Sequence, residues 1–196
     1  MGKAERTRQF IIETAAPIFN QKGVAGTAIS DILDATRLAK GGIYGNFTSK
    51  EEMVLEVFDY IAEIEKQQLK ALTAAATTAV AKFEAVFRYY ARYMSNRKVP
   101  GGCPVINFGS EADDTNPALK KRVGNLAKYF LSRIEYLVMF GKETGEFRED
   151  WDEKEFAIMM FTILEGGILI TSITRNNKYM LSVVEILRKE VRRHMR

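Results

Sequence analysis

Small, basic and aromatic side chains between residues 39 and 50 carry the most specific chemistry in the sequence. Lys40 can donate hydrogen bonds to guanine O6 and N7, and Tyr44 and Lys50 can reach phosphate oxygens. The residues around Lys40 are small: Ala39, Gly41 and Gly42. Small residues let the backbone of a helix come close to DNA. This combination predicts a surface that reads double-stranded DNA.

Two short apolar-periodic segments must position this surface. The expected inner faces are Ile29, Ile32 and Leu33 in the first segment, and Leu38, Ile43 and Phe47 in the second. Two short helices joined by about four residues, packed on a helix over about residues 3–21, form a helix-turn-helix. The motif would run from about Ala28 to Phe47. Thr27, at the start of its first helix, is expected to contact a phosphate, and Ala28 beside it is a further candidate DNA-binding residue.

The remaining sequence predicts an all-α fold of about nine helices without strands, because helical spacing of apolar residues dominates throughout. Either Thr48 with Glu51 or Ser49 with Glu52 can form a capping box that starts a long helix. Gly23 is a plausible C-cap of the first helix. The expected domains are residues 1–50 for DNA binding and 51–196 for ligand sensing and dimerisation, linked by the helix from about residue 49.

Charge and composition narrow the class of protein. Residues 1–50 carry seven basic and four acidic side chains, so most of the net charge of +4 lies beside the predicted DNA surface. With a single cysteine the chain forms no intrachain disulfide, which favours a cytoplasmic location. No uninterrupted apolar run approaches a membrane span, so no membrane contact is expected.

Nothing in the sequence favours an enzyme. The one histidine, His194, lies in a charged tail without metal-ligand spacing around it, so neither a metal site nor a histidine-based triad is expected. No glycine-rich loop follows a strand, so a phosphate-binding loop is not expected either. We therefore predict neither catalysis nor a cofactor.

The block Leu38-Ala39-Lys40-Gly41-Gly42-Ile43-Tyr44-Gly45-Asn46-Phe47, followed by Ser49-Lys50-Glu51, resembles the tetracycline-repressor (TetR) family. About ten positions agree in order and spacing, over about a quarter of the chain. The resemblance implies an operator-binding helix-turn-helix domain, a sensor domain of about six helices, and a homodimer formed by the last two helices.

Two positions depart from the family pattern. Arg37 stands at the turn where the family usually has glycine, and a positive φ there costs a non-glycine residue about 1 kcal/mol. Arg37 either offsets this by touching a phosphate or the turn has another shape. Asn46 stands where the family often has histidine, which affects the expected DNA contact at that position.

The second part of the chain contains candidates for an effector site. Four aromatic residues could line a pocket for an apolar or aromatic ligand: Phe87, Tyr90, Phe130 and Phe161. The alternative is that most of them belong to the ordinary core. The block Gly102–Asn107 resembles the opening of the sensor helix in one branch of the family, some of whose members sense electrophiles through a cysteine. This makes Cys103 and Asn107 candidate sensor residues, although a single cysteine is more often a plain buried side chain.

The sequence as a whole predicts a homodimeric regulator of transcription, in particular a repressor released from its operator by a small ligand or by modification of Cys103. The alternative is a helical protein-binding module in which the first three helices are only structural. An enzyme of an unrecognised type is a more distant possibility. A DNA affinity that falls steeply with salt would distinguish the regulator from the protein-binding module.

Overall fold

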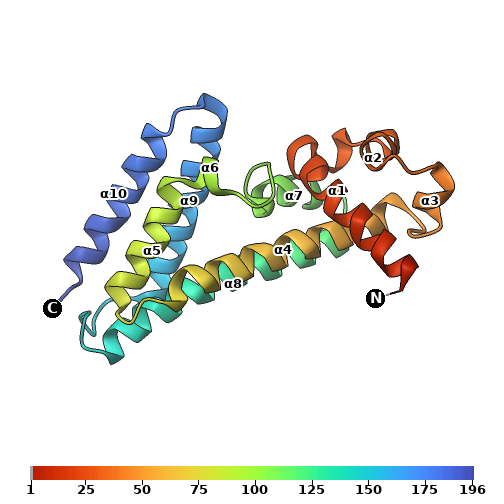
Figure 1. Cartoon of the computed structure of the whole chain (residues 1–196). Helices are drawn as coiled ribbons and strands as arrows, with labels where there is room; N and C mark the ends of the chain where they lie inside the picture. The colour runs from red at the N-terminus through yellow and green to blue at the C-terminus, as the bar shows by residue number, and fades with distance from the viewer. Residues whose placement is uncertain (1) are drawn as a thin grey trace. The chain divides into compact units, whose positions relative to one another are not determined.

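The computed structural model describes residues 2–196 and confirms the all-α fold. Those residues form ten helices and no named strand, with one isolated bridge between Phe147 and Met195. The helices are α1 (Lys3–Gly26), α2 (Ile29–Thr36), α3 (Lys40–Tyr44), α4 (Lys50–Ala74), α5 (Ala79–Ala91), α6 (Tyr93–Asn96), α7 (Pro104–Ala112), α8 (Pro117–Glu143), α9 (Glu153–Thr174) and α10 (Lys178–Arg193) (Figure 1). The sequence predicts about nine helices, and the additional one is α6, a single turn.

By packing, the chain divides into two compact units. Unit 1 contains the residues up to Glu65 together with Lys98–Leu126, and unit 2 contains Lys66–Arg97 with Ala127–Arg196. This division differs from a boundary after residue 50, because α7 and the beginning of α8 belong to the same unit as α1–α3. The assignment of residues 1–50 to DNA binding and 51–196 to sensing stays a prediction.

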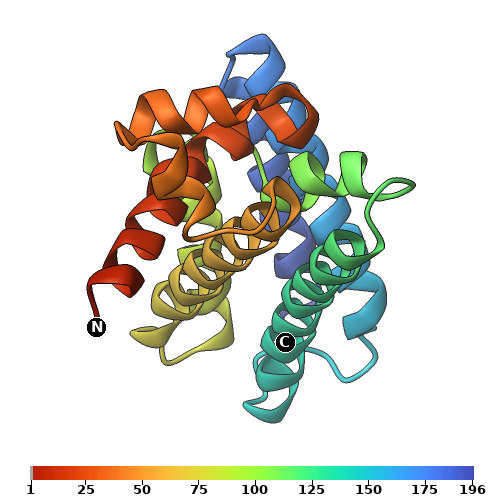
Figure 2. The same cartoon turned by 90° about the vertical axis from the view of Figure 1, so that its right-hand side faces the viewer.

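In unit 1, α1 packs against both α2 and α7 (Figures 1 and 2). The first helix is longer than expected: it bends at Gly23, where φ is +77°, and resumes to Gly26. Gly23 is therefore a kink rather than a C-cap. An L side chain rarely adopts this conformation, and a Cβ at Gly23 would lie 2.2 Å from Oε1 of Glu111. The backbone conformation favours glycine here, whereas the end of the Glu111 side chain could shift away from an added Cβ.

The start of α4 uses the second of the two capping registers. Ser49 Oγ accepts from the backbone N–H of Glu52 at 3.1 Å, as an N-cap does. The Glu52 carboxylate reaches back one residue further than in a standard box, because it accepts from the N–H (2.7 Å) and hydroxyl (2.6 Å) of Thr48. At its other end α4 stops at Ala74, and Thr78 caps α5 after a short connection.

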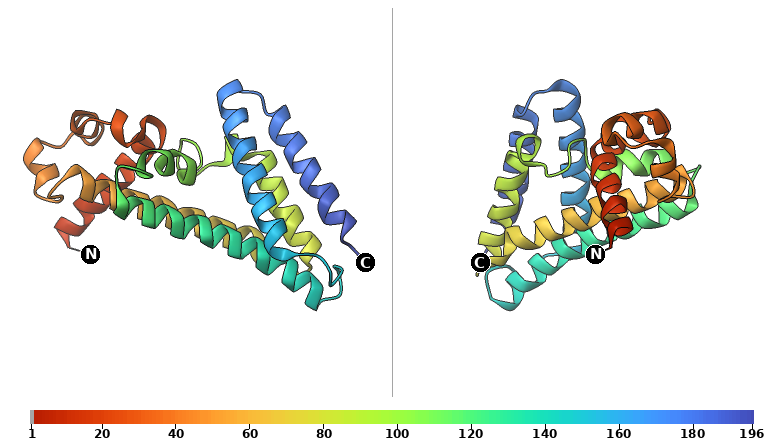
Figure 3. Two further views of the ribbon diagram at one scale, coloured as in Figure 1. Left: turned by 180° about the vertical axis from the view of Figure 1, so that it is seen from behind. Right: turned by 45° about the vertical axis from the view of Figure 1, so that its right-hand side comes forward.

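In unit 2, α10 packs against α9 and α5, and Figure 3 shows α9 and α10 running antiparallel. Asp152 caps α9, because its carboxylate accepts from the N–H groups of Lys154 and Glu155, each at 2.9 Å. The core of this unit is aromatic: Phe83 lies within 6.4 Å, centroid to centroid, of four other rings. These rings are Phe87, Phe147, Trp151 and Phe156.

Candidate nucleic-acid interface

The turn between α2 and α3 has the left-handed conformation that the sequence pattern suggested. Arg37 adopts φ +59° and ψ +20°, and its N–H donates to Leu33 O at 2.9 Å. The hydroxyl of Thr36 secures the same turn by donating to Ile32 O at 2.7 Å and accepting from Leu38 N–H at 3.3 Å. The turn therefore keeps its usual shape despite the arginine, whose side chain is exposed.

The outer face of α3 consists of small residues around one cation. Lys40, Gly41 and Tyr44 are exposed, and Lys40 Nζ lies 5.8 Å from the centre of the Tyr44 ring. A Cβ added at Gly41 would have no neighbour within 4 Å, so this side of the helix is open. A short helix of this kind can bring its backbone and a lysine donor to base edges in the major groove.

The inner face of the motif is fixed by apolar burial. Ile32, Ile43 and Phe47 are buried, while Ile29, Leu33 and Leu38 are half-buried. These anchors lock the rotation of α3 about its axis, because turning it would bring Ile43 into water. Lys40 and Tyr44 consequently have to face outward.

Other predicted contact residues are already bound within the protein. The Asn46 amide donates to Gly42 O at 2.7 Å, and Lys50 Nζ donates to Val24 O at 2.6 Å. Asn46, Lys50 and Gly42 are half-buried, whereas Ala28 and Ala39 are exposed. Contacts of these residues with DNA remain predictions.

The position of Thr27 differs from the one that the sequence predicts. We expected its side chain to reach a phosphate from the start of α2, but only 1% of the residue is exposed and its hydroxyl donates to Gly23 O at 2.7 Å. The N-cap position belongs to Ala28, whose N–H donates to the Asp31 carboxylate at 2.9 Å. Thr27 therefore closes the bend at the end of α1.

Two carboxylates of α4 fasten that helix to α1, and the sequence did not reveal them as a pair. Arg8 donates to Glu52 at 2.5 Å and to Glu56 at 2.9 Å, and its guanidinium lies 4.1 Å from the centre of the Phe47 ring. Hydrogen bonds from the Thr48 side chain and from Arg8 lower the pKa of Glu52 to about 2. The only earlier signal was the capping pattern that contains Glu52.

Helix α7 is held against α1 by two further polar clusters. The buried Asn20 amide donates to Pro100 O and Gly102 O at 3.1 Å each, and Asn107 Nδ2 donates to Asn20 O at 2.8 Å. The Glu111 carboxylate accepts from two successive backbone N–H groups after the Gly23 bend. Glu111 is thus a structural clamp between α7 and the end of α1. Residues 2–196 contain no group of acidic, histidine and cysteine side chains that could hold a metal.

Comparison with known proteins identifies the family. The model of bacterial regulatory proteins of the tetR family matches residues 11–57, and that of the tetracyclin repressor-like C-terminal domain matches residues 79–187. The chain belongs to the tetracycline-repressor family.

Solved structures of TetR-family regulators are similar over nearly the whole length. One from Cytophaga hutchinsonii is 37% identical with a TM-score of 0.90, covering 100% of this chain and 98% of the other. One from Chloroflexus aurantiacus is 34% identical with a TM-score of 0.94, covering 100% and 99%. The transcriptional repressor DhaR of Mycobacterium sp. (strain GP1) is 23% identical over 87% of this chain and 85% of its own. This TetR-family protein is a DNA-binding regulator of transcription.

The C-terminal TetR region contains an apolar cavity in unit 2. Its wall is formed by α4, α5, α8 and α9 and includes three of the predicted sensor residues: Tyr90, Phe130 and Phe161. Phe130 and Phe161 stack with ring centres 6.1 Å apart. The fourth, Phe87, is buried in the aromatic core instead, where it stacks on Phe83. The cavity encloses about 20 Å³, which is room for about one water molecule.

Cys103 and Asn107, the other two predicted sensor residues of this TetR chain, belong to unit 1 and do not line this cavity. Cys103 is the N-cap of α7 and only 4% exposed. Asn107 is engaged with Asn20. The six predicted sensor residues therefore do not form one site.

Proposed function

We propose that this protein is a homodimeric repressor that binds double-stranded operator DNA through α3 and is released by a small effector. The observation that carries the proposal is the outer face of α3, where Lys40 and Tyr44 are exposed on a helix whose rotation is fixed by Ile43. We place Ala28, Arg37 and Ala39 at the edge of the DNA interface, because they too are exposed. A bacterial regulator of this kind acts in the cytoplasm, where its DNA is.

The DNA contact is tested by a gel shift with operator fragments selected from a random pool. We expect affinity to fall steeply with salt, and Lys40→Ala to relax sequence preference at one base pair by about 1–3 kcal/mol. Lys154→Ala is the matched control, since Lys154 is exposed on α9. A wild-type protein that selects no sequence would favour the alternative of a helical protein-binding module.

A second copy of the chain would cover α9 and α10. Both helices expose large apolar side chains: Ile158, Leu169, Ile170, Ile173, Tyr179, Leu181 and Ile186. On α9, Gly166 lies between the exposed residues Ile158 and Leu169 in the sequence. A Cβ added at Gly166 would have no neighbour within 4 Å, so another helix can approach closely there. Two helices from each copy would form a four-helix bundle, and the two-fold pair would present two reading heads to a two-fold operator.

The same exposed side chains account for the composition of α9. It is long and apolar enough to cross a membrane, and only 44% of its most apolar stretch is buried inside the chain. We attribute this to the dimer, in line with the expected absence of membrane contact. Ile173→Glu, at a side chain that is 73% exposed, should give a monomer in sedimentation and a large loss of operator affinity. Tyr136→Glu is the control, because Tyr136 is exposed on α8. If the Ile173→Glu variant is still a dimer, this interface is refuted.

We place the effector in the cavity of unit 2, which must widen to accept a ligand because it now holds about 20 Å³. The stacked Phe130 and Phe161 rings are the part of the wall we expect to separate. A ligand that binds the widened state better than the closed one shifts the population of the protein toward it. Release follows if the widened state binds the operator less well.

Thiol modification is a second candidate mechanism, favoured by the position of Cys103. Its carbonyl accepts from the N–H of Asn107 at 2.9 Å, and Asn107 holds α1 through Asn20. Because Cys103 is only 4% exposed, an adduct has to displace the start of α7 and strain this clamp. Alkylation should then weaken operator binding, and unchanged affinity of fully alkylated protein would eliminate the mechanism.

A further inference from the structure

The lining of the cavity in unit 2 has one charged side chain, and this side chain forms no ion pair with another described residue. The lining includes Arg133 but no aspartate or glutamate. Arg133 stacks over the Tyr136 ring, with its guanidinium carbon 4.7 Å from the ring centre, and takes part in none of the ion pairs of the described residues. The side chain is half-buried, and Tyr136 beside it is 45% exposed. The positive charge therefore lies where the cavity meets the surface.

The rest of the lining is suited to an uncharged hydrocarbon or aromatic group. Apart from Arg133, only Thr73 and Tyr90 carry polar groups, and the Thr73 hydroxyl is directed to Leu69 O and Lys70 O in its own helix. The other lining residues are aliphatic and aromatic apart from Met160, with Leu137, Phe161 and Leu164 among them. A ligand here would bury its apolar part and keep a single charged end beside Arg133.

Building on the proposed effector role of this cavity, we propose that the effector is an amphipathic monocarboxylate. Its apolar part fills the widened cavity, and its carboxylate accepts two parallel hydrogen bonds from the Arg133 guanidinium. The planar fork of arginine matches the two oxygens of a carboxylate. One arginine without a second cation in the lining favours a single negative charge over a phosphate. An amine would be repelled by the same charge.

Calorimetric titration of the full-length protein with two matched series tests this. The series are 4-phenylbutyrate, 4-phenylbutanol and 4-phenylbutylamine, and decanoate, decanol and decylamine. We expect the carboxylate of at least one series to bind roughly tenfold or more tightly than its alcohol, with the amine weakest. Arg133→Met should weaken carboxylate binding roughly 10- to 100-fold and leave the alcohol within about twofold. Arg133→Lys keeps the charge but not the planar fork, so its affinity for the carboxylate should lie between those of the unmodified protein and Arg133→Met.

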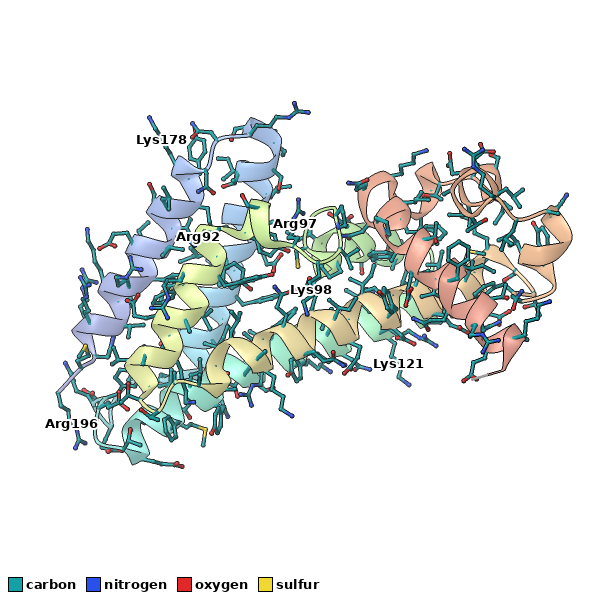
Figure 4. All side chains as sticks on the ribbon, viewed as in Figure 1. Arg92, Arg97, Lys98, Lys121, Lys178 and Arg196 are labelled. Atoms are coloured by element: carbon teal, nitrogen blue, oxygen red, sulfur yellow. The ribbon has the colours of Figure 1, made fainter. Side chains whose placement is uncertain are left out.

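Arg92→Met is the matched control, because Arg92 is exposed at the end of α5 and outside the cavity lining (Figure 4). Unchanged alcohol binding by Arg133→Met shows that the variant is folded and the cavity intact. Equal affinities for acid and alcohol, or an equal loss of both in Arg133→Met, would overturn the monocarboxylate inference while leaving the effector cavity in place. If no compound of either series binds, the proposed effector site itself fails. Operator affinity without ligand tests DNA binding separately.

Discussion

A different interaction is most prominent inside each of the two compact units, although unit 2 also has polar clamps, such as the Glu146 carboxylate that accepts from the N–H groups of Ala79 and Val80. In unit 1, the helices around the DNA-reading motif are joined by directional polar contacts, such as Arg8 with Glu52 and Asn20 with Asn107. In unit 2, the centre is a set of stacked and edge-on rings around Phe83. Hydrogen bonds are lost when geometry changes by less than an ångström, whereas ring contacts adapt to small shifts.

The difference fits the roles proposed for the two units, with DNA reading in unit 1 and effector binding in unit 2. On DNA, a reading head must present Lys40 and Tyr44 at defined positions relative to the base pairs, so directional contacts between the helices that carry α3 are appropriate there. A sensor whose cavity has to widen needs a wall that can rearrange without leaving polar groups unpaired, and an apolar wall meets that requirement. Each prediction below tests one side of this comparison.

The largest effect is expected in the aromatic core. Phe83→Ala removes a ring that is fully buried and touches four others, which should lower the free energy of unfolding by about 3–5 kcal/mol. Urea denaturation followed by circular dichroism measures this. Tyr136→Ala, on the surface of the same unit, should change stability by less than about 1 kcal/mol. A similar loss in both variants would mean that the ring cluster is not the main source of stability in unit 2.

The polar clamp on α1 is expected to matter less for stability and more for local order. Asn107→Ala leaves the buried oxygens of Asn20 without their donor, at a cost of about 1–3 kcal/mol. Hydrogen exchange should then quicken at Val24 and Ala25, next to the Glu111 clamp, before it does in α10. Ser110→Ala, an exposed neighbour on α7, is the control. Uniform acceleration in both units would contradict a local role.

The Glu52 contacts give unit 1 a pH dependence. The pKa of Glu52 is about 2 in the folded protein, below the ordinary value of 4.5, because Thr48 and Arg8 hold the carboxylate. A depressed folded pKa adds stability that is present above pH 4.5 and is lost as the pH falls toward 2. Solvent screens this partly exposed pair, so we expect a modest shift of the urea midpoint. Glu52→Gln should reduce the change of the urea midpoint with pH, and Asp34→Asn, exposed on α2, should not. An equal pH dependence in Glu52→Gln and the unmodified protein would exclude Glu52 as its source.

The elements of this fold were predictable because they depend on local sequence, while the polar clamps depend on tertiary placement. The apolar spacing located α2 and α3, and Asp152 marked the start of α9 because an N-cap acts within three residues. Glu111 and Asn107 bind α1 across more than 80 residues, so no local pattern announces them. Thr27 differs, because its hydroxyl bonds to Gly23 O only four residues away, at a bend that the sequence did not predict.

The predicted sensor residues show most clearly what sequence spacing does not predict. Phe87 and Phe161 are both apolar residues at helical spacing, yet one lies in the core and the other lines the cavity. Spacing tells which residues face inward but not whether the space beside them is filled. Cys103 and Asn107 were grouped with these rings by resemblance, and the fold assigns them to the other unit.

The smallest expected effect concerns α3 itself, where we predict that the helix is loose in the absence of DNA. It has five residues, two of them glycines, and glycine costs a helix about 1 kcal/mol relative to alanine. Gly41→Ala adds a methyl group with no neighbour within 4 Å, so it should slow amide exchange in α3 by roughly fivefold. Gly45→Ala should not, because its Cβ would lie 2.9 Å from Gly41 O.

This pair of variants distinguishes two explanations for the glycines of α3. If Gly41→Ala orders the free helix and leaves operator affinity unchanged or higher, the glycine contributes only flexibility. If it orders the helix and weakens binding, the open face at Gly41 is needed for close approach of the backbone to DNA. Slow exchange of α3 amides in the unmodified protein would refute the looseness itself, and the reading head would then be as rigid as the clamps that hold it.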